Sequence, residues 1–263
     1  MSNLPAEMLD HIVDLLDGSQ TPLRNCCLVS KSWIPRTRRH LFAEVRFQTT
    51  KSLQSWQKTF PDPPTSPARY TKTLFVGCPQ VITGADAGVD SWIRSFTSVV
   101  RLWFGGRDLN ARGWEVAFVL FRAFSPVVKS LRMDFSSLPF PNFFDLVLSF
   151  PLLEDLAMTS CHDVPIDNWG DSDGLSTFDR SSNLPVFTGS LDLLLRGGMG
   201  PTVHRLLSLP SGIHFRKLTL TWFRGEDISA TVGLVGMCSH TLESLDIACN
   251  LRGTFVGYLR PHG

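Results

Sequence analysis

The sequence lacks a hydrophobic run long enough to cross a membrane, and it lacks a secretory signal. No apolar stretch approaches the roughly 20 residues that a bilayer-spanning helix needs. The first residues, MSNLPAEMLDHIVD, contain no basic segment and are interrupted by acidic side chains. No Asn-x-Ser/Thr glycosylation sequence with a non-proline middle residue occurs. We therefore expect a chain of the cytoplasm or the nucleus, where thiols stay reduced, with no membrane partner.

Motifs that bind metals or carry out catalysis are also missing. None of the six cysteines forms a C-x2-C pair, and the histidines stand at no zinc-finger spacing. Asp171 and Asp173 begin like a calcium loop, but Leu175, Ser176 and Ser182 stand where that loop needs an oxygen ligand, glycine and glutamate. No G-x-S-x-G, P-loop, H-E-x-x-H or deaminase motif occurs. We expect no metal, no cofactor and no catalytic residue, and so a protein that is not an enzyme.

Charge of one sign is not in excess, whereas apolar side chains are abundant. The 25 Lys and Arg residues nearly balance the 24 Asp and Glu residues, which gives a net charge of +1. No overall field therefore favours a nucleic-acid partner. Hydrophobic residues make up 43% of the 263 positions, which is enough to build a sizeable core.

The first 44 residues read as three short helices. LPAEMLDHIVDLL, at 4–16, has apolar residues at three- and four-residue spacing, which predicts an amphipathic helix that begins near Pro5. DGSQTP then separates it from a second helix, whose apolar side is formed by Leu23, Cys26 and Cys27. The adjacent cysteines point to different sides of that helix, so we do not expect a shared metal or redox site. A third helix follows, and Pro35 ends or restarts it.

These residues resemble an F-box. The family pattern begins with Leu-Pro-x-Glu, and its second half reads Leu-Val-Ser/Cys-Lys/Arg-x-Trp. Both halves are present, as LPAE at 4–7 and LVSKSW at 28–33. The resemblance implies a substrate-recognition subunit of a cullin-RING (SCF-type) ubiquitin ligase, in which the F-box docks on a small acidic adaptor protein. It places adaptor binding at Leu4, Pro5, Ile12, Leu28, Val29, Lys31 and Trp33. The alternative is that the helices only cap a non-degradative interaction scaffold.

The remaining chain, 45–263, repeats the pattern L-x-L, which is typical of a short strand with one buried face. The first apolar positions of successive copies lie 29, 28, 29, 25, 35, 27 and 27 residues apart. The eight pairs are Val45/Phe47, Leu74/Val76, Leu102/Phe104, Leu131/Met133, Leu156/Met158, Leu191/Leu193, Leu218/Leu220 and Leu245/Ile247.

Helix-like segments fill most of the gaps between these pairs, at 52–60, 89–96, 114–124, 142–150, 203–209 and 228–237. A strand followed by a helix every 27 or so residues is typical of leucine-rich-repeat-like solenoids. We therefore predict an α/β fold in which an N-terminal three-helix unit precedes a solenoid with one parallel curved sheet. The step of 35 is explained by an irregular loop at 159–186, rich in Asp, Ser, Gly and Asn. A doubly wound domain is the rival fold, but no glycine-rich phosphate turn follows any strand.

In such a strand the two apolar residues face the helices, so the residues around them face the concave side. Trp and Arg are favoured anchors in protein interfaces. We predict that Phe75, Trp103 and Arg132, on three successive strands, form the centre of a substrate site. The wider predicted site adds Asp134, Asp155, Asp192, Lys217 and Asp246. Its substrate is a protein that the sequence does not identify.

Overall fold

A computed structural model of the chain describes residues 5–16, 19–77, 89–106, 124, 126–135, 143–160, 184–195, 200–223 and 227–249. Several predicted features therefore lie outside the described residues. They are Leu4, the helix expected at 114–124 apart from Phe124, the rejected calcium loop from Asp171, and most of the loop at 159–186.

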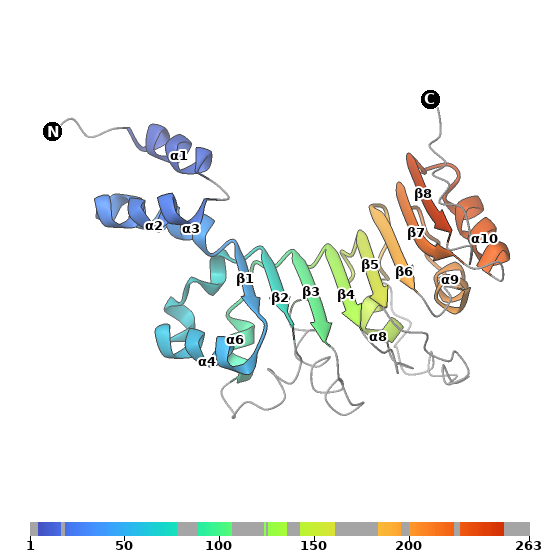
Figure 1. The fold of residues 1–263 in the computed structure, drawn as a ribbon, viewed down its shortest axis with the longest axis horizontal. Helices are drawn as coiled ribbons and strands as arrows, with labels where there is room; N and C mark the ends of the chain where they lie inside the picture. The colour runs from blue at the N-terminus through green and yellow to red at the C-terminus, as the bar shows by residue number, and fades with distance from the viewer. Residues whose placement is uncertain are drawn as a thin grey trace.

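The N-terminal helices form a small unit beside the first strand (Figure 1). They are α1 (Ala6–Leu15), α2 (Gln20–Val29), the 3-10 turn η1 (Lys31–Trp33) and α3 (Ile34–Leu41). Pro35 stands in the first turn of α3, so it restarts the helix, as a ring with a fixed φ and no N–H can do there. Two polar contacts join α1 to α3: Arg36 Nε forms an ion pair with Asp10 Oδ1 at 2.6 Å, and His40 Nε2 lies 2.9 Å from Asp14 Oδ1.

All eight predicted L-x-L pairs lie in strands, and these strands form one parallel sheet in the order β1 to β8. The strands are β1 (Glu44–Phe47), β2 (Thr73–Val76), β3 (Arg101–Gly106), β4 (Ser130–Phe135), β5 (Asp155–Ser160), β6 (Ser190–Leu195), β7 (Lys217–Phe223) and β8 (Ser244–Cys249). Figure 1 shows them side by side along the length of the molecule, with the last strands turned upward. Sequential order contradicts the doubly wound alternative, in which the strand order reverses.

Helices connect several of the strands. They are α4 (Thr50–Thr59), α6 (Val89–Arg94), α8 (Phe143–Leu148), α9 (Gly200–Leu207) and α10 (Ile228–Cys238), together with the short turns η2 (Pro63–Thr65) and η3 (Pro67–Tyr70). Each lies within or beside a segment predicted to be helical, except the two short turns. The arrangement is a solenoid-like α/β fold.

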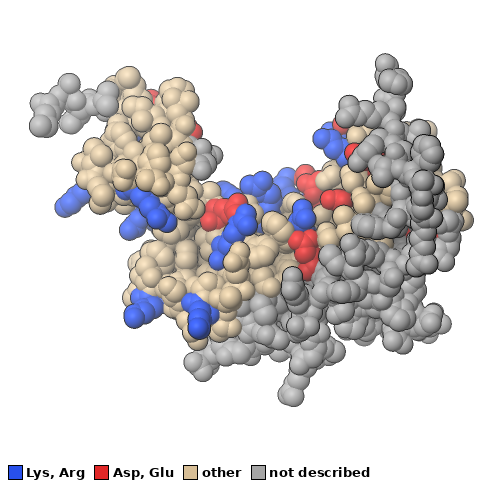
Figure 2. All heavy atoms as spheres, in the orientation of Figure 1, with Lys and Arg blue, Asp and Glu red and all other residues tan. Residues whose placement is uncertain are grey.

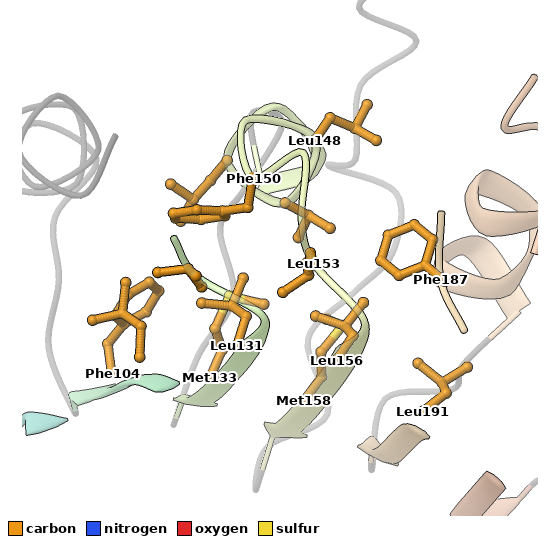
Figure 3. Packing of buried hydrophobic residues seen from close by; sticks show 14 of the residues in the cluster. Phe104, Leu131, Met133, Leu148, Phe150, Leu153, Leu156, Met158, Phe187 and Leu191 are labelled. Atoms are coloured by element: carbon orange, nitrogen blue, oxygen red, sulfur yellow. The ribbon is translucent and has the colours of Figure 1, made fainter. Parts of the chain in front are cut away.

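The core lies between the sheet and these connections. The paired apolar residues of β1 to β7 are all buried, whereas Leu245 and Ile247 of β8 are half-buried. Figure 3 shows Leu131, Met133, Leu156 and Met158 pointing from neighbouring strands toward Phe150 and α8. One buried phenylalanine also precedes each of β3 to β7, a recurrence that was not predicted from the sequence: Phe96, Phe124, Phe150, Phe187 and Phe215.

A repeated hydrogen bond aligns the strand starts. The carbonyl just before a strand accepts two N–H groups from the start of the next strand; Lys72 O, for example, accepts from Val100 N and Arg101 N, both at 2.9 Å. The step from β5 to β6 differs. There Glu154 O accepts only from Gly189 N, and Ser190 N donates instead to the Asp155 carboxylate at 2.6 Å. The Asp155 carboxylate thus replaces the Glu154 carbonyl as acceptor for Ser190 N, at the start of the strand that follows the longest connection.

Candidate functional site

The face of the sheet opposite the core carries a continuous row of side chains, which we call the central row. Successive strand pairings align its eight members without a shift: Arg46, Phe75, Trp103, Arg132, Ala157, Asp192, Thr219 and Asp246. The flanking residues Leu74, Leu102 and Leu131 are 2% exposed or less, so the predicted register is confirmed. We call this side of the sheet the open face. Figure 2 shows it as a hollow floored by charges of both signs.

Aromatic rings and guanidinium groups contact one another at the β1–β4 end of the central row. The rings of Phe75 and Trp103 meet edge to face at 4.8 Å. The Arg132 guanidinium lies over the Trp103 ring at 4.6 Å, and that of Arg46 lies 5.8 and 5.9 Å from the Phe75 and Trp103 rings. Such contacts hold both partners in place while leaving one side in water. All three residues predicted as the site centre are therefore brought together. Arg46 joins them and was not predicted, although its place between Val45 and Phe47, like that of Phe75 between Leu74 and Val76, could have identified it.

Asp134, two residues after Arg132 on β4, fixes this cluster in place. Trp103 Nε1 donates to Asp134 Oδ2 at 2.6 Å, and Arg132 Nε lies 3.3 Å from Asp134 Oδ1. One carboxylate therefore orients both the indole and the guanidinium. A charge-assisted hydrogen bond of this kind is stronger than a neutral one.

The remaining predicted residues lie further along the face and are not joined to Trp103 by any interaction seen in the described residues. Burial raises the pKa of the Asp192 carboxyl, the Arg132 guanidinium opposes this effect, and the Asp134 carboxylate adds to it. Asp155 accepts hydrogen bonds from Ser190 N and from Ser190 Oγ, so its carboxylate holds the first residue of β6 in place. Lys217 and Asp246 are exposed near the β8 end.

A second surface is formed by the N-terminal helices. Leu28 and Val29, at the end of α2, are 86% and 69% exposed. Lys31 follows them and is also exposed, while Ile12 and Trp33 are half-buried. Pro5 is exposed just before α1, so the structure places it on a different helix from Leu28. Val13, Leu23 and Cys26 are buried and hold the unit together, which leaves Leu28 and Val29 without a described packing role.

Within the described residues, no three His, Cys, Asp or Glu side chains are grouped so that they could hold a metal ion. No helix of that part of the chain has the length and apolar character of a membrane span.

Comparison with models of known protein families, with curated proteins and with solved structures found no match to this chain. The two surfaces and the sequence pattern must therefore support any functional assignment.

Proposed function

We propose that this protein is the substrate-recognition subunit of a cullin-RING ubiquitin ligase of the SCF type. In this proposal residues 1–44 are an F-box that docks on the adaptor. Residues 45–263 are a leucine-rich-repeat-like solenoid that holds a protein substrate on the open face. The complex acts in the cytoplasm or the nucleus.

The exposure of Leu28 and Val29 is the observation that carries the proposal. Two adjacent large apolar side chains lie in water at the end of α2, within the stretch LVSKSW that resembles the second half of the F-box pattern. Exposed apolar patches rimmed by charged residues mark interaction sites, and Lys31 lies beside this one. Burying a valine side chain against a partner stabilises a complex by about 1.5–3 kcal/mol.

The open face supports the substrate-holding half of the proposal. Its aromatic and arginine side chains are already ordered by their mutual contacts, so little side-chain freedom is lost when a partner binds. The protein itself breaks no bond in this mechanism. It raises the effective concentration of substrate lysines near the ubiquitin-loaded enzyme.

Adaptor binding is tested by co-expression and co-purification with the adaptor, using two matched variants. Val29 and Val232 are 69% and 66% exposed, but Val232 lies on α10 near the other end of the solenoid. Val29→Gln should weaken adaptor binding by about tenfold or more, and Val232→Gln should leave it unchanged. The Leu4→Ala, Pro5→Ala double variant should also lose the adaptor while the solenoid stays folded.

Equal binding by wild type and the Val29 and Leu4/Pro5 variants would reject the F-box assignment. The chain would then be a non-degradative interaction scaffold, the second function that the open face supports. Trp103→Ala separates the two halves of the proposal, because it should weaken substrate capture without weakening adaptor binding. Equal loss of both would indicate a folding defect.

A further inference from the structure

A second row of side chains lies on the open face, two residues before the central row on each strand, and we call it the starting row. Alternate residues of a strand share a face, so both rows are on the same side of the sheet. Strand pairing aligns its members on β1 to β5, which are Glu44, Thr73, Arg101, Ser130 and Asp155. It likewise aligns Ser190, Lys217 and Ser244 on β6 to β8.

Arg101, on β3, is exposed and has neutral neighbours in the starting row. Its register partners are Thr73 on β2 and Ser130 on β4, which both have short hydroxyl side chains. Lys72 stands immediately before Thr73 and is a second exposed cation. Figure 2 shows Lys and Arg side chains gathered in the hollow beside the N-terminal helices. In the part of the chain that the structure describes, the side chains of Arg101 and Lys72 form no ion pair, hydrogen bond or ring contact.

The carboxylates of the starting row are already engaged. Glu44 lies two strands from Arg101, a distance of about 10 Å, and forms an ion pair with Arg46. Asp155 lies two strands away on the other side and accepts hydrogen bonds from Ser190. The positive charge of Arg101 therefore has no counter-charge in its own row.

An ordered aromatic ring lies beside this unpaired guanidinium. Trp103 is two residues after Arg101 on β3, so the two side chains share the open face about 6.8 Å apart. The indole is half-buried, and it is held by the edge-to-face contact with Phe75 and the hydrogen bond to Asp134. An apolar surface that is already fixed thus adjoins a cation that can still accept a partner.

We infer that Arg101 binds the carboxylate of an Asp or Glu residue in a protein segment whose neighbouring apolar side chain contacts Trp103. A guanidinium can donate two parallel hydrogen bonds to one carboxylate, which gives such a pair a defined geometry. The contact with Trp103 is needed as well, because an exposed ion pair alone contributes little. The inference rests on the proposed role of the open face in holding a substrate.

The charges around Arg101 favour a protein over a nucleic acid. A nucleic-acid strand brings a phosphate at every nucleotide, and proteins that bind it neutralise several phosphates together. Here the carboxylates of Glu44 and Asp134 lie close to the cations and would repel neighbouring phosphates. A segment with one acidic side chain brings a single negative charge to the one guanidinium that lacks a partner.

The test uses the full chain, labelled with nitrogen-15, and two blocked tripeptides observed by two-dimensional NMR. Acetyl-Glu-Ala-Trp-amide carries a carboxylate and an aromatic ring two residues apart, which matches the spacing of Arg101 and Trp103. Acetyl-Gln-Ala-Trp-amide is its neutral isostere. The Glu peptide should give saturable shifts at the amide of Arg101 and at the indole N–H of Trp103. The Gln peptide should bind more weakly by about threefold or more.

Two variants locate the binding site. Arg101→Gln should weaken the Glu peptide by about threefold or more and leave the Gln peptide unchanged, because the lost interaction needs both charges. Lys217→Gln is the matched control, since Lys217 is an exposed cation of the same row with serine on both neighbouring strands. Thr219, and not an aromatic residue, stands two residues after it, so this variant should bind both peptides normally.

Equal binding of the two peptides to the wild-type chain, no saturable shift at the Trp103 indole, or full binding of the Glu peptide by Arg101→Gln would each overturn the inference. The first two results need no variant, so they decide even if Arg101→Gln misfolds. A thymidine hexanucleotide that binds more tightly than the Glu peptide, and is lost in Arg101→Gln, would also overturn it and indicate a nucleic-acid surface.

None of these measurements depends on the adaptor. Failure of the peptide tests with intact adaptor binding therefore rejects this inference only. Loss of adaptor binding with intact peptide binding rejects the F-box proposal only.

Discussion

Two tryptophan-to-phenylalanine substitutions remove the same indole atoms, one from a tryptophan whose N–H group forms a hydrogen bond and one from a tryptophan whose N–H group does not. Trp103 Nε1 donates to Asp134 at 2.6 Å. Trp56 Nε1 is buried and has no hydrogen-bond partner among the described residues; its ring packs against Phe42, Phe47, Phe60 and Phe96. Comparing Trp103→Phe with Trp56→Phe therefore isolates the contribution of the indole N–H group.

The expected difference in the free energy of unfolding follows from these contacts. Each substitution loses about 1–2 kcal/mol of apolar packing. Trp103→Phe also loses a hydrogen bond to a charged group, worth about 1.5–3 kcal/mol, and the half-exposed site favours the lower value. Trp56→Phe instead relieves a buried N–H group that costs about 1–3 kcal/mol. We expect Trp103→Phe to lower stability by about 2–4 kcal/mol and Trp56→Phe to change it by less than about 1 kcal/mol.

Thermal unfolding followed by far-UV circular dichroism measures this difference. A loss of 1 kcal/mol shifts the midpoint of a chain of this size by about 2–4 °C, so the two variants should differ by roughly 6–12 °C. Both sites lie at the β1–β3 end of the solenoid, so both report on the same part of the fold. Equal midpoints for the two variants would refute the assigned role of the Trp103–Asp134 hydrogen bond.

Three further predictions concern the rest of the chain. Gly189→Ala should lower stability by about 2–4 kcal/mol in urea unfolding, because the added methyl group would overlap the Asp155 carboxylate, while Gly236→Ala, with open space in α10, should raise it by about 0.5–1 kcal/mol. Burial raises the pKa of Asp192, so the folded chain binds that proton more tightly than the unfolded chain, and the resulting stabilisation is lost as pH rises above about 4. Asp192→Asn should therefore gain stability relative to wild type between pH 4 and 7, and a constant difference over that range would contradict the assignment. Burial also raises the pKa of the Cys238 thiol, so mass spectrometry should find it alkylated far more slowly than the partly exposed Cys27 at neutral pH; equal rates would show that α10 opens readily.

The sheet could be predicted from the sequence because a strand with one buried face must alternate. Each L-x-L pair marked both the strand and the side it buries, and the pairs aligned in register from β1 to β8. The buried phenylalanines were missed because their distance from the next strand varies; Phe96 precedes Leu102 by six residues and Phe215 precedes Leu218 by three. The role of Asp155 was also beyond the sequence, since it depends on a hydrogen bond to a residue 35 positions away.

The central row stays in register from β1 to β8, so the distances between its side chains are fixed by the spacing of the strands. Neighbouring strands are about 4.8 Å apart, so Phe75 on β2 and Ala157 on β5 are separated by roughly 14 Å. Side chains on one side of an extended polypeptide recur every 6.8 Å or about that, and two such steps cover nearly the same span. A bound extended segment therefore contacts these two positions with residues four apart. A bound helix, which rises about 1.5 Å per residue, needs nine or ten residues for the same span. The spacing between the two contact residues in a bound segment thus reveals whether it binds as a strand or as a helix.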